Sequence, residues 1–197
     1  MKKLIKRREI PGGNPVSDNT LLDRLYRSRH IKNSQELDRT LQSMLNPNQL
    51  YGIQQAVNLL VDAYQQKQKI VIVGDFDADG ATSTALSVLA LCMLGFTGVE
   101  YLVPNRFEQG YGLSVPVAEM AMGKGVQLLM TVDNGVSSFE GVAYLKEQGV
   151  KVLITDHHLP PEILPNADAI VNPNLQQCGF PSKCLAGVGV AFYLMLA

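Results

Sequence analysis

Three aspartates stand at alternate positions in the run KIVIVGDFDADG, which spans residues 69–80. Asp75, Asp77 and Asp79 follow an apolar, β-branched stretch that is typical of a short buried strand. Carboxylates this close repel one another, and the repulsion favours either protonation or a shared cation. We therefore expect a divalent-metal site just beyond the carboxyl end of this strand.

The same letters also begin an EF-hand calcium loop, D-x-D-x-D-G. An EF-hand needs a glutamate at its twelfth position, which here is Leu86, and a helix in front of the loop instead of a β-branched strand. Both requirements fail, so the sequence argues against a calcium loop. The remaining alternative to a metal site is a solvated acidic turn that binds no ion.

The composition is that of a soluble globular protein, with 46% hydrophobic and 18% charged residues among 197. The net charge of −1 gives no overall attraction to nucleic acid, so a polyanion must be held by local basic groups or by metals. The charge is uneven, because residues 1–32 carry nine Lys and Arg against three acids. This basic arm either lies near a phosphate backbone or is a solvated helical face.

Cysteine usage and the chain ends indicate a cytoplasmic protein without membrane association. The three cysteines are odd in number and lack the paired spacing of a zinc site. No apolar stretch follows the basic start, so we expect no signal peptide. The apolar segment 185–197 is too short to span a bilayer. It also lacks a capping residue, so we expect the chain to be truncated inside a helix.

Helical patterns precede the central strand. Asn33 followed by Glu36 resembles a capping box and predicts the start of the second of three helices. The predicted helices span residues 18–30, 33–45 and 49–66. We expect a basic helical segment over 1–48, packed on a catalytic domain that spans 49–197.

From residue 69 onward, apolar strands alternate with polar loops and helices. The predicted strands are 70–74, 99–103, 127–132, 151–155 and 168–172, and the helices between them lie near 81–94, 114–123 and 138–148. This alternation is typical of an α/β fold with a doubly wound, mostly parallel five-stranded sheet and helices on both faces.

The polar residues that could do chemistry follow the ends of these strands. The loops after the first four strands carry Asp75, Asp77 and Asp79, then Asn105 and Arg106, then Asp133 and Asn134, then Asp156, His157 and His158. In an open parallel sheet these loops meet at one edge, where ligands bind. We expect the side chains to converge on one crevice.

Individual residue types suggest roles within that crevice. Arg106 suits bidentate contact with phosphate. Tyr111 lies between two glycines and could stack on a base or simply anchor its loop. Neighbouring side chains point apart, so we expect one of the two adjacent histidines to bind metal and His158 to face a phosphate, as a proton donor or a hydrogen-bond donor.

The segments DFDADG, PNRFEQGYGLS, TVDNGVSS and TDHH, in this order, resemble the DHH phosphoesterase family. From Gly74 onward the chain is similar to the family's single-strand-specific DNA exonucleases, which degrade from the five-prime end. The resemblance implies a metal-dependent phosphodiester hydrolase that acts on single-stranded DNA in repair and recombination. It also implies a pair of divalent cations, Mn²⁺ or Mg²⁺, and the mixed carboxylate and imidazole donors favour Mn²⁺.

The resemblance also implies roles residue by residue. Metal ligation falls to Asp77, Asp79, Asp133 and His157, with Asp75 as a further ligand or a partner to one. Catalysis falls to His158 and Asp156, and substrate binding to Asn105, Arg106 and Tyr111.

Two alternatives stay open. One is a DHH phosphoesterase that cleaves short oligonucleotides or pyrophosphate, and the other is a non-catalytic metal-binding fragment. The resemblance leads us to expect another metal-binding carboxylate and a second domain beyond the DHH motif, and Asp168 is misplaced for that carboxylate. We therefore expect the isolated chain to bind metal incompletely and to be weak or inactive.

Overall fold

The computed structural model describes residues 4, 6, 9–38 and 40–197. Its contacts divide the chain into two compact units, Met1–Leu45 and Asn46–Ala197. Part of the predicted basic arm, residues 1–3, 5, 7 and 8, lies outside the described residues. The packing of the amino-terminal segment on the core stays a prediction.

The first unit contains less helix than the sequence predicted. It has one helix, α1 (Thr20–Arg27), and two 3₁₀ turns, η1 (Ser34–Leu37) and η2 (Leu41–Ser43). Asn33 does accept the amide hydrogen of Glu36, at 3.2 Å. The predicted helix to residue 45 is nevertheless wrong, because Asp38 is extended and its side chain accepts the amide of Thr40 at 2.9 Å. Such a local bond competes with helix propagation.

The second unit alternates strands and helices, as predicted. Its strands are β1 (Ile70–Gly74), β2 (Val99–Leu102), β3 (Leu128–Val132), β4 (Lys151–Thr155) and β5 (Ala169–Val171). Its helical segments are η3 (Pro47–Gln49), α2 (Ile53–Gln65), α3 (Ala78–Met93), α4 (Arg106–Gln109), α5 (Val115–Gly123), α6 (Phe139–Glu147) and α7 (Gly187–Leu196).

Helix α3 begins three residues earlier than the sequence suggested. Asp77 is its N-cap, and Oδ1 of Asp77 accepts the amides of Asp79 and Gly80 at 3.1 and 3.0 Å. A capping aspartate satisfies amide groups at a helix start that would otherwise have no partner, which allows α3 to begin at Ala78. Asp79 therefore lies in the first helical turn and not in a loop.

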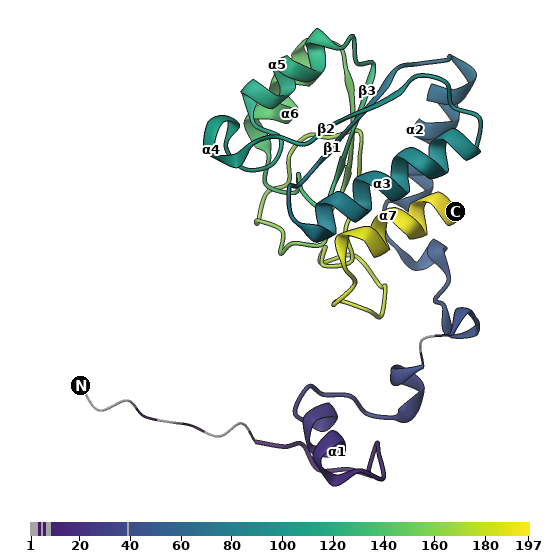
Figure 1. Cartoon of the computed structure of the whole chain (residues 1–197), viewed down its shortest axis with the longest axis vertical. Helices are drawn as coiled ribbons and strands as arrows, with labels where there is room; N and C mark the ends of the chain where they lie inside the picture. Colours follow the sequence, from purple (N-terminus) through teal and green to yellow (C-terminus); the bar gives the residue numbers. More distant parts are fainter. Residues whose placement is uncertain (1–3, 5, 7–8, 39) are drawn as a thin grey trace. The chain divides into compact units, whose positions relative to one another are not determined.

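The five strands form one parallel sheet in the order β2-β1-β3-β4-β5. Figure 1 shows α5 and α6 on one side of this sheet and α3 and α7 on the other, which confirms the predicted fold class. The chain moves outward from β1 to β2 and then returns past β1 to β3. The loops after β1 and β3 therefore diverge to opposite faces, and such a switch point is where open α/β sheets bind ligands.

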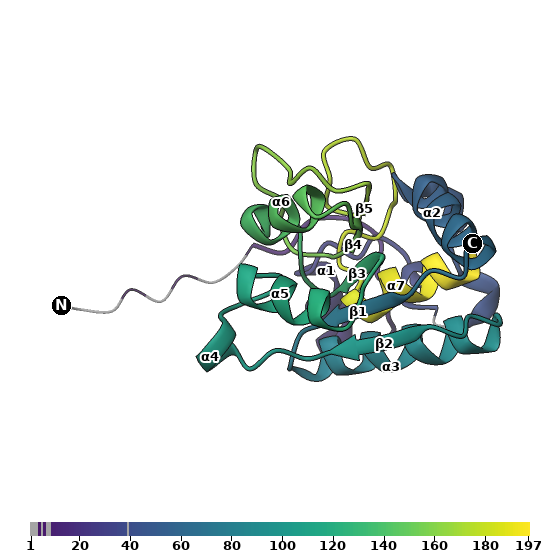
Figure 2. The same cartoon turned by 90° about the horizontal axis from the view of Figure 1, so that it is seen from above.

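Both faces of the central strands are covered. Val71 and Val73 of β1 belong to a buried cluster with apolar residues of α5 and α6 (Figure 2). Ile70 and Ile72 are fully buried as well and, because side chains alternate along a strand, they lie on the other face of the sheet. Burial on two sides explains why β1 is a continuous apolar run without alternation. The result is a rigid frame whose strand ends are fixed in position.

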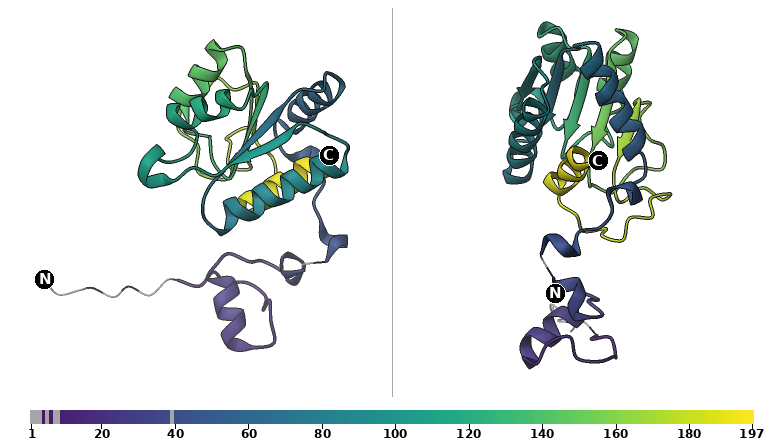
Figure 3. Two further views of the ribbon diagram at one scale, coloured as in Figure 1. Left: turned by 45° about the horizontal axis from the view of Figure 1, so that its top comes forward. Right: turned by 90° about the vertical axis from the view of Figure 1, so that its right-hand side faces the viewer.

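Helix α7 places the last apolar segment alongside α3 (Figure 3). The apolar segment 185–197 was expected to lie in a helix, and it is helical from Gly187. A Cβ atom at Gly187 would lie 2.5 Å from Oδ1 of Asp133, so glycine lets the start of α7 approach that carboxylate. Among the described residues, no helix is long and apolar enough to cross a bilayer.

We expect the substitution Gly80→Ala to destabilise the fold. The added Cβ would lie 2.3 Å from the backbone oxygen of Asp75, and this overpacking should lower the free energy of unfolding by about 1–3 kcal/mol. Gly123→Ala is the matched control, because its Cβ would have no atom within 4 Å and should be neutral or slightly stabilising. Urea denaturation of both variants measures the difference, and equal midpoints would contradict the packing argument.

Candidate metal centre

Asp133 is the buried carboxylate on which the site is built. It follows β3 with a φ of 61°, a left-handed conformation in which aspartate is among the tolerated residues, and it is 2% exposed. Its Oδ1 has no hydrogen-bond partner among the described residues. Nε2 of His157 lies 3.0 Å from this oxygen, without the geometry of a hydrogen bond. Two donor atoms at this spacing fit a common cation.

The electrostatic surroundings of Asp133 point in the same direction. Burial, followed by the nearby charge of Asp79, raises the pKa of Asp133 to about 7 from the ordinary 3.8, although the charge of His157 opposes the rise. Ionising this carboxylate costs free energy without a cation, and the ionised form becomes favourable once a cation neutralises it.

His157 is oriented as a metal-binding imidazole. Its Nδ1 lies 2.9 Å from the carbonyl oxygen of Leu185, and because a carbonyl only accepts, Nδ1 carries the proton. The lone pair of Nε2 is then directed toward Asp133 and toward Oδ2 of Asp79, which is 3.6 Å away. A histidine that donates its other ring nitrogen to a carbonyl is the usual arrangement at metal sites.

Asp79 also holds the amino terminus of α7. Its Oδ2 and Oδ1 accept the amides of Gly187 and Val188, both at 2.8 Å. A carboxylate is favourable at this helix end because the macrodipole and the free amides are positive there. If Asp79 also binds a cation, the same carboxylate both caps α7 and serves as a metal ligand.

Asp75 and Arg106, predicted to serve metal and phosphate respectively, pair with each other. Nε of Arg106 donates to Oδ1 of Asp75 at 3.0 Å, and Nη2 donates to the other oxygen. The hydrogen bond from Asp75 raises the pKa of Arg106. The guanidinium carbon lies 4.2 Å from the ring centroid of Phe76 and 4.9 Å from that of Tyr111. Arg106 is thus held at the edge of the acidic cluster.

Two sets of residues place donor atoms within 4.8 Å of one another: Asp133 with His157 and His158, and Asp75 with Asp77 and Asp133. Asp133 belongs to both sets, so the arrangement fits two neighbouring divalent cations that share one carboxylate. Oxygen and imidazole donors suit Mn²⁺ and Mg²⁺. Of the predicted ligands, only Asp79 falls outside both sets, and it stands 3.6 Å from His157.

Asp156 orients the two histidines. It is 1% exposed, and its Oδ1 accepts the amides of His157 and His158 and Nδ1 of His158, at 2.7, 3.1 and 2.7 Å. Its Oδ2 accepts the amide of Val136 at 2.9 Å. Asp156, predicted as catalytic, is therefore a positioning residue in this geometry.

His158 presents Nε2 to the outside of the cluster, 3.5 Å from the hydroxyl of Tyr111. Burial lowers the pKa of His158, but the hydrogen bond to Asp156 and the charges of Asp156, Asp133 and Asp75 outweigh it, so the net pKa is raised. Burial raises the pKa of Tyr111 to about 12, and the negative charges of the same three aspartates add to this rise. Tyr111 therefore keeps its proton near neutral pH, and the raised pKa of His158 favours its protonated form relative to an ordinary histidine, so both can donate to an anionic oxygen.

The sequence analysis did not identify two asparagines that fix the histidine backbone. Nδ2 of Asn172 donates to the carbonyl of His158 at 2.9 Å, and Nδ2 of Asn174 donates to that of His157 at 2.5 Å. Asn172 follows β5, so the strand-end rule used for the other four loops would have found it. Asn105 caps α4 through a 3.1 Å bond from the Phe107 amide, and its contact with substrate stays a prediction.

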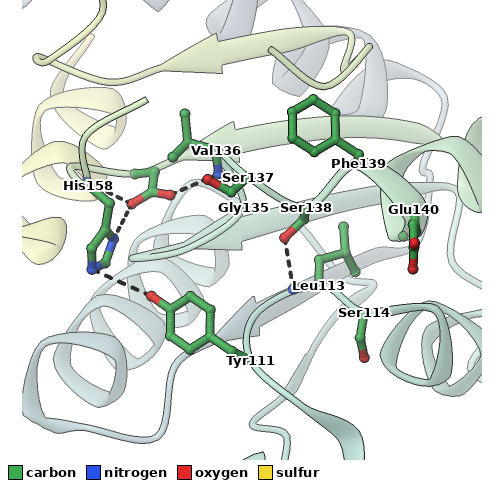
Figure 4. A pocket seen from close by; sticks show the side chains of 12 residues that line it. Tyr111, Leu113, Ser114, Gly135, Val136, Ser137, Ser138, Phe139, Glu140 and His158 are labelled. Carbon is green, nitrogen blue, oxygen red and sulfur yellow. Dashed lines mark hydrogen bonds and ion pairs between the residues drawn. The ribbon is translucent and has the colours of Figure 1, made fainter. Parts of the chain in front are cut away.

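A pocket of about 600 Å³ adjoins this cluster. It is lined by the loop 135–138, by the first turn of α6, and by Tyr111, Leu113, Ser114, Asp156 and His158. Figure 4 shows His158 and Tyr111 together at one side of it, with Phe139 and Glu140 at the other. The pocket therefore opens directly beside the outward nitrogen of His158.

Curated relatives share the whole length of this chain. It is 84% identical over 197 residues to the single-stranded-DNA-specific exonuclease RecJ of Haemophilus influenzae, covering 100% of this chain and 34% of that protein. It is 55% identical over 195 residues to RecJ of Escherichia coli, covering 98% of this chain and 34% of the relative. The chain thus spans about a third of the length of these relatives.

Solved structures show the same fold. A crystal structure of exonuclease RecJ bound to manganese matches 74% of this chain and 37% of its own, with a TM-score of 0.68 and 37% identity. Thermus thermophilus RecJ with Mn²⁺ matches 86% of this chain and 23% of its own, at TM-score 0.69 and 33% identity. The structure of the same protein with Mg²⁺ matches 86% of this chain and 19% of its own, with a TM-score of 0.52 and 29% identity.

Metal binding should stabilise the chain in a pH-dependent way through Asp133. Without metal, the proton on Asp133 stabilises the fold, and that contribution is lost as pH rises from about 3.8 to about 7. A cation needs the ionised carboxylate, so Mn²⁺ should raise the thermal midpoint more at pH 8 than at pH 6. Circular-dichroism melts with and without MnCl₂ test this. Asp133→Asn should reduce the pH dependence, the remainder coming from the neutral imidazole that metal binding needs at His157. An equal metal effect at both pH values in the unsubstituted chain would contradict the prediction.

A model of the DHH family, N-terminal domain, matches residues 69–197. The matched segment runs from the start of β1 to the end of α7 and contains both donor sets. The chain belongs to the DHH family.

Proposed function

We propose that this chain is the metal-binding catalytic part of a single-strand-specific DNA exonuclease, a phosphodiester hydrolase that uses Mn²⁺ or Mg²⁺. The observation that carries the proposal is the buried Oδ1 of Asp133, which has no hydrogen-bond partner among the described residues and faces Nε2 of His157 at 3.0 Å, on a residue that belongs to two donor sets. A carboxylate shared between two sets can hold two neighbouring cations, and two such cations can catalyse phosphoester hydrolysis.

The chemistry of the surrounding residues fits an anionic substrate. When bound, the cations neutralise phosphate oxygens and lower the pKa of water. Asp75 holds Arg106 at the edge of the cluster, 3.9 Å from Asp77, where its charge can attract a phosphate. Asp156 fixes the ring of His158 through Nδ1, and the protonated form of this imidazole can donate Nε2–H to the leaving oxygen. Tyr111 shares a hydrogen bond with His158 and supports its orientation.

The substrate class follows from the relatives. Those that match over 98–100% of this chain are named single-stranded-DNA-specific exonucleases. On this basis we assign single-stranded DNA as the substrate. Cleavage from the five-prime end, a role in DNA repair and recombination, and a cytoplasmic location are parts of the proposal that come from the motif resemblance to the family. The cysteines of the chain are free, which agrees with a reducing compartment.

The assignment is tested by removing one ligand at a time. With Mn²⁺, end-labelled single-stranded DNA and enough protein to measure the weak cleavage expected of the isolated chain, Asp77→Ala and His157→Ala should each lower the rate by about 100-fold or more. A lost donor weakens or misplaces a cation. Rates are read from the release of labelled nucleotide on denaturing gels. EDTA should abolish cleavage, and added Mn²⁺ should restore it.

Asp62→Asn is the control for loss of a surface carboxylate. Asp62 lies on α2, 3.8 Å from Lys151 at the first residue of β4, which is the strand end opposite the site. This variant should cleave at the unsubstituted rate. If Asp77→Ala and His157→Ala also retain that rate, the site assignment is wrong. A preference for di- and trinucleotides over longer strands would instead favour a short-oligonucleotide phosphoesterase.

A further inference from the structure

The pocket beside His158 differs in charge from the rest of the site. Its lining contains neither lysine nor arginine, and its two acids are Asp156 and Glu140. Asp156 is buried and engaged with the histidines, while Glu140 is exposed at the start of α6. Away from His158, the Glu140 carboxylate repels phosphate, so the end of the pocket at α6 does not suit the sugar-phosphate backbone.

The lining suits a flat, polar-edged aromatic group instead. Phe139 is 41% exposed on the first turn of α6, although aromatic side chains of this size usually bury most of their surface. Exposed Ser137 and the Glu140 carboxylate supply hydrogen-bonding groups nearby. The backbone that carries them is fixed, since the Ser138 amide donates to Gly135 and its hydroxyl accepts the Leu113 amide at 3.2 Å.

We infer that this pocket binds one nucleobase of the substrate, with Phe139 as the surface on which the base stacks. The inference rests on the proposed function and extends it by a subsite. His158 belongs both to the pocket lining and to the metal donor set, so it lies at the boundary between them. The base in the pocket is therefore that of the nucleoside on the leaving-oxygen side of the scissile phosphate, the oxygen that His158 faces. Stacking tolerates all four bases, as a nuclease without sequence preference requires.

Phosphate and base are thereby recognised on different sides of His158. Arg106 stands on the side of Asp75 and Phe76, and the neutral-to-acidic pocket lies on the side of α6. The volume of about 600 Å³ accommodates a nucleoside.

The test compares two small probes in the presence of Mn²⁺: deoxyadenosine monophosphate and 2-deoxyribose 5-phosphate, which lacks the base. By isothermal titration calorimetry, the full chain should bind the nucleotide about 10-fold more tightly than the base-free sugar phosphate. Phe139→Ala should bring the two dissociation constants to within about twofold, and Phe139→Tyr should restore the preference.

Phe107→Ala is the matched control, because Phe107 is a 94% exposed phenylalanine of α4 that does not line the pocket. It should keep the base preference. Thermal melts check that Phe139→Ala remains folded, as expected for a partly exposed side chain. A base preference that survives Phe139→Ala, or none in the unsubstituted chain, overturns the inference.

The outcomes separate the subsite from the proposed function. If single-stranded DNA is not cleaved but base preference depends on Phe139, the subsite stands and the exonuclease assignment fails. If cleavage depends on His157 while Phe139→Ala leaves base preference unchanged, the assignment stands and the subsite is wrong.

Discussion

The structure depends on the cost of burying the carboxylate of Asp133. Its backbone adopts a left-handed conformation, its side chain is 2% exposed, and one oxygen lacks a hydrogen-bond partner among the described residues. Burial and the nearby Asp79 hold its pKa near 7. Ionising such a buried carboxylate is unfavourable without a cation and favourable beside one. The need for a metal ion therefore arises mainly from this one residue.

The acids around Asp133 serve the fold as well as the site. Asp77 caps α3, and Asp79 caps α7 through two 2.8 Å bonds to residues that lie more than a hundred positions away. Asp156 aligns both histidines. Because the same carboxylates end helices and surround the metal positions, the geometry of the site is set by the packing of rigid elements and not by a flexible loop.

Local patterns in the sequence were sufficient for most of the architecture. The five strands were predicted within one or two residues, because a strand buried on both faces is a continuous apolar run. The helix over 33–45 was wrong because Asp38 makes a local bond that no periodicity reveals. The ion pair between Asp75 and Arg106 was also missed, because the two residues are 31 positions apart. Each had been given a separate role, Asp75 toward metal and Arg106 toward phosphate.

The sequence alone determined which residues could do chemistry and that they follow strand ends, because residue type and strand periodicity are local properties. Only the tertiary structure decided the strand order β2-β1-β3-β4-β5, which places the carboxyl ends of β1 and β3 next to each other. It also decided that Asp133 is shared between two donor sets and that α7 closes on Asp79. These are contacts between distant segments, and their geometry is fixed by how whole elements pack.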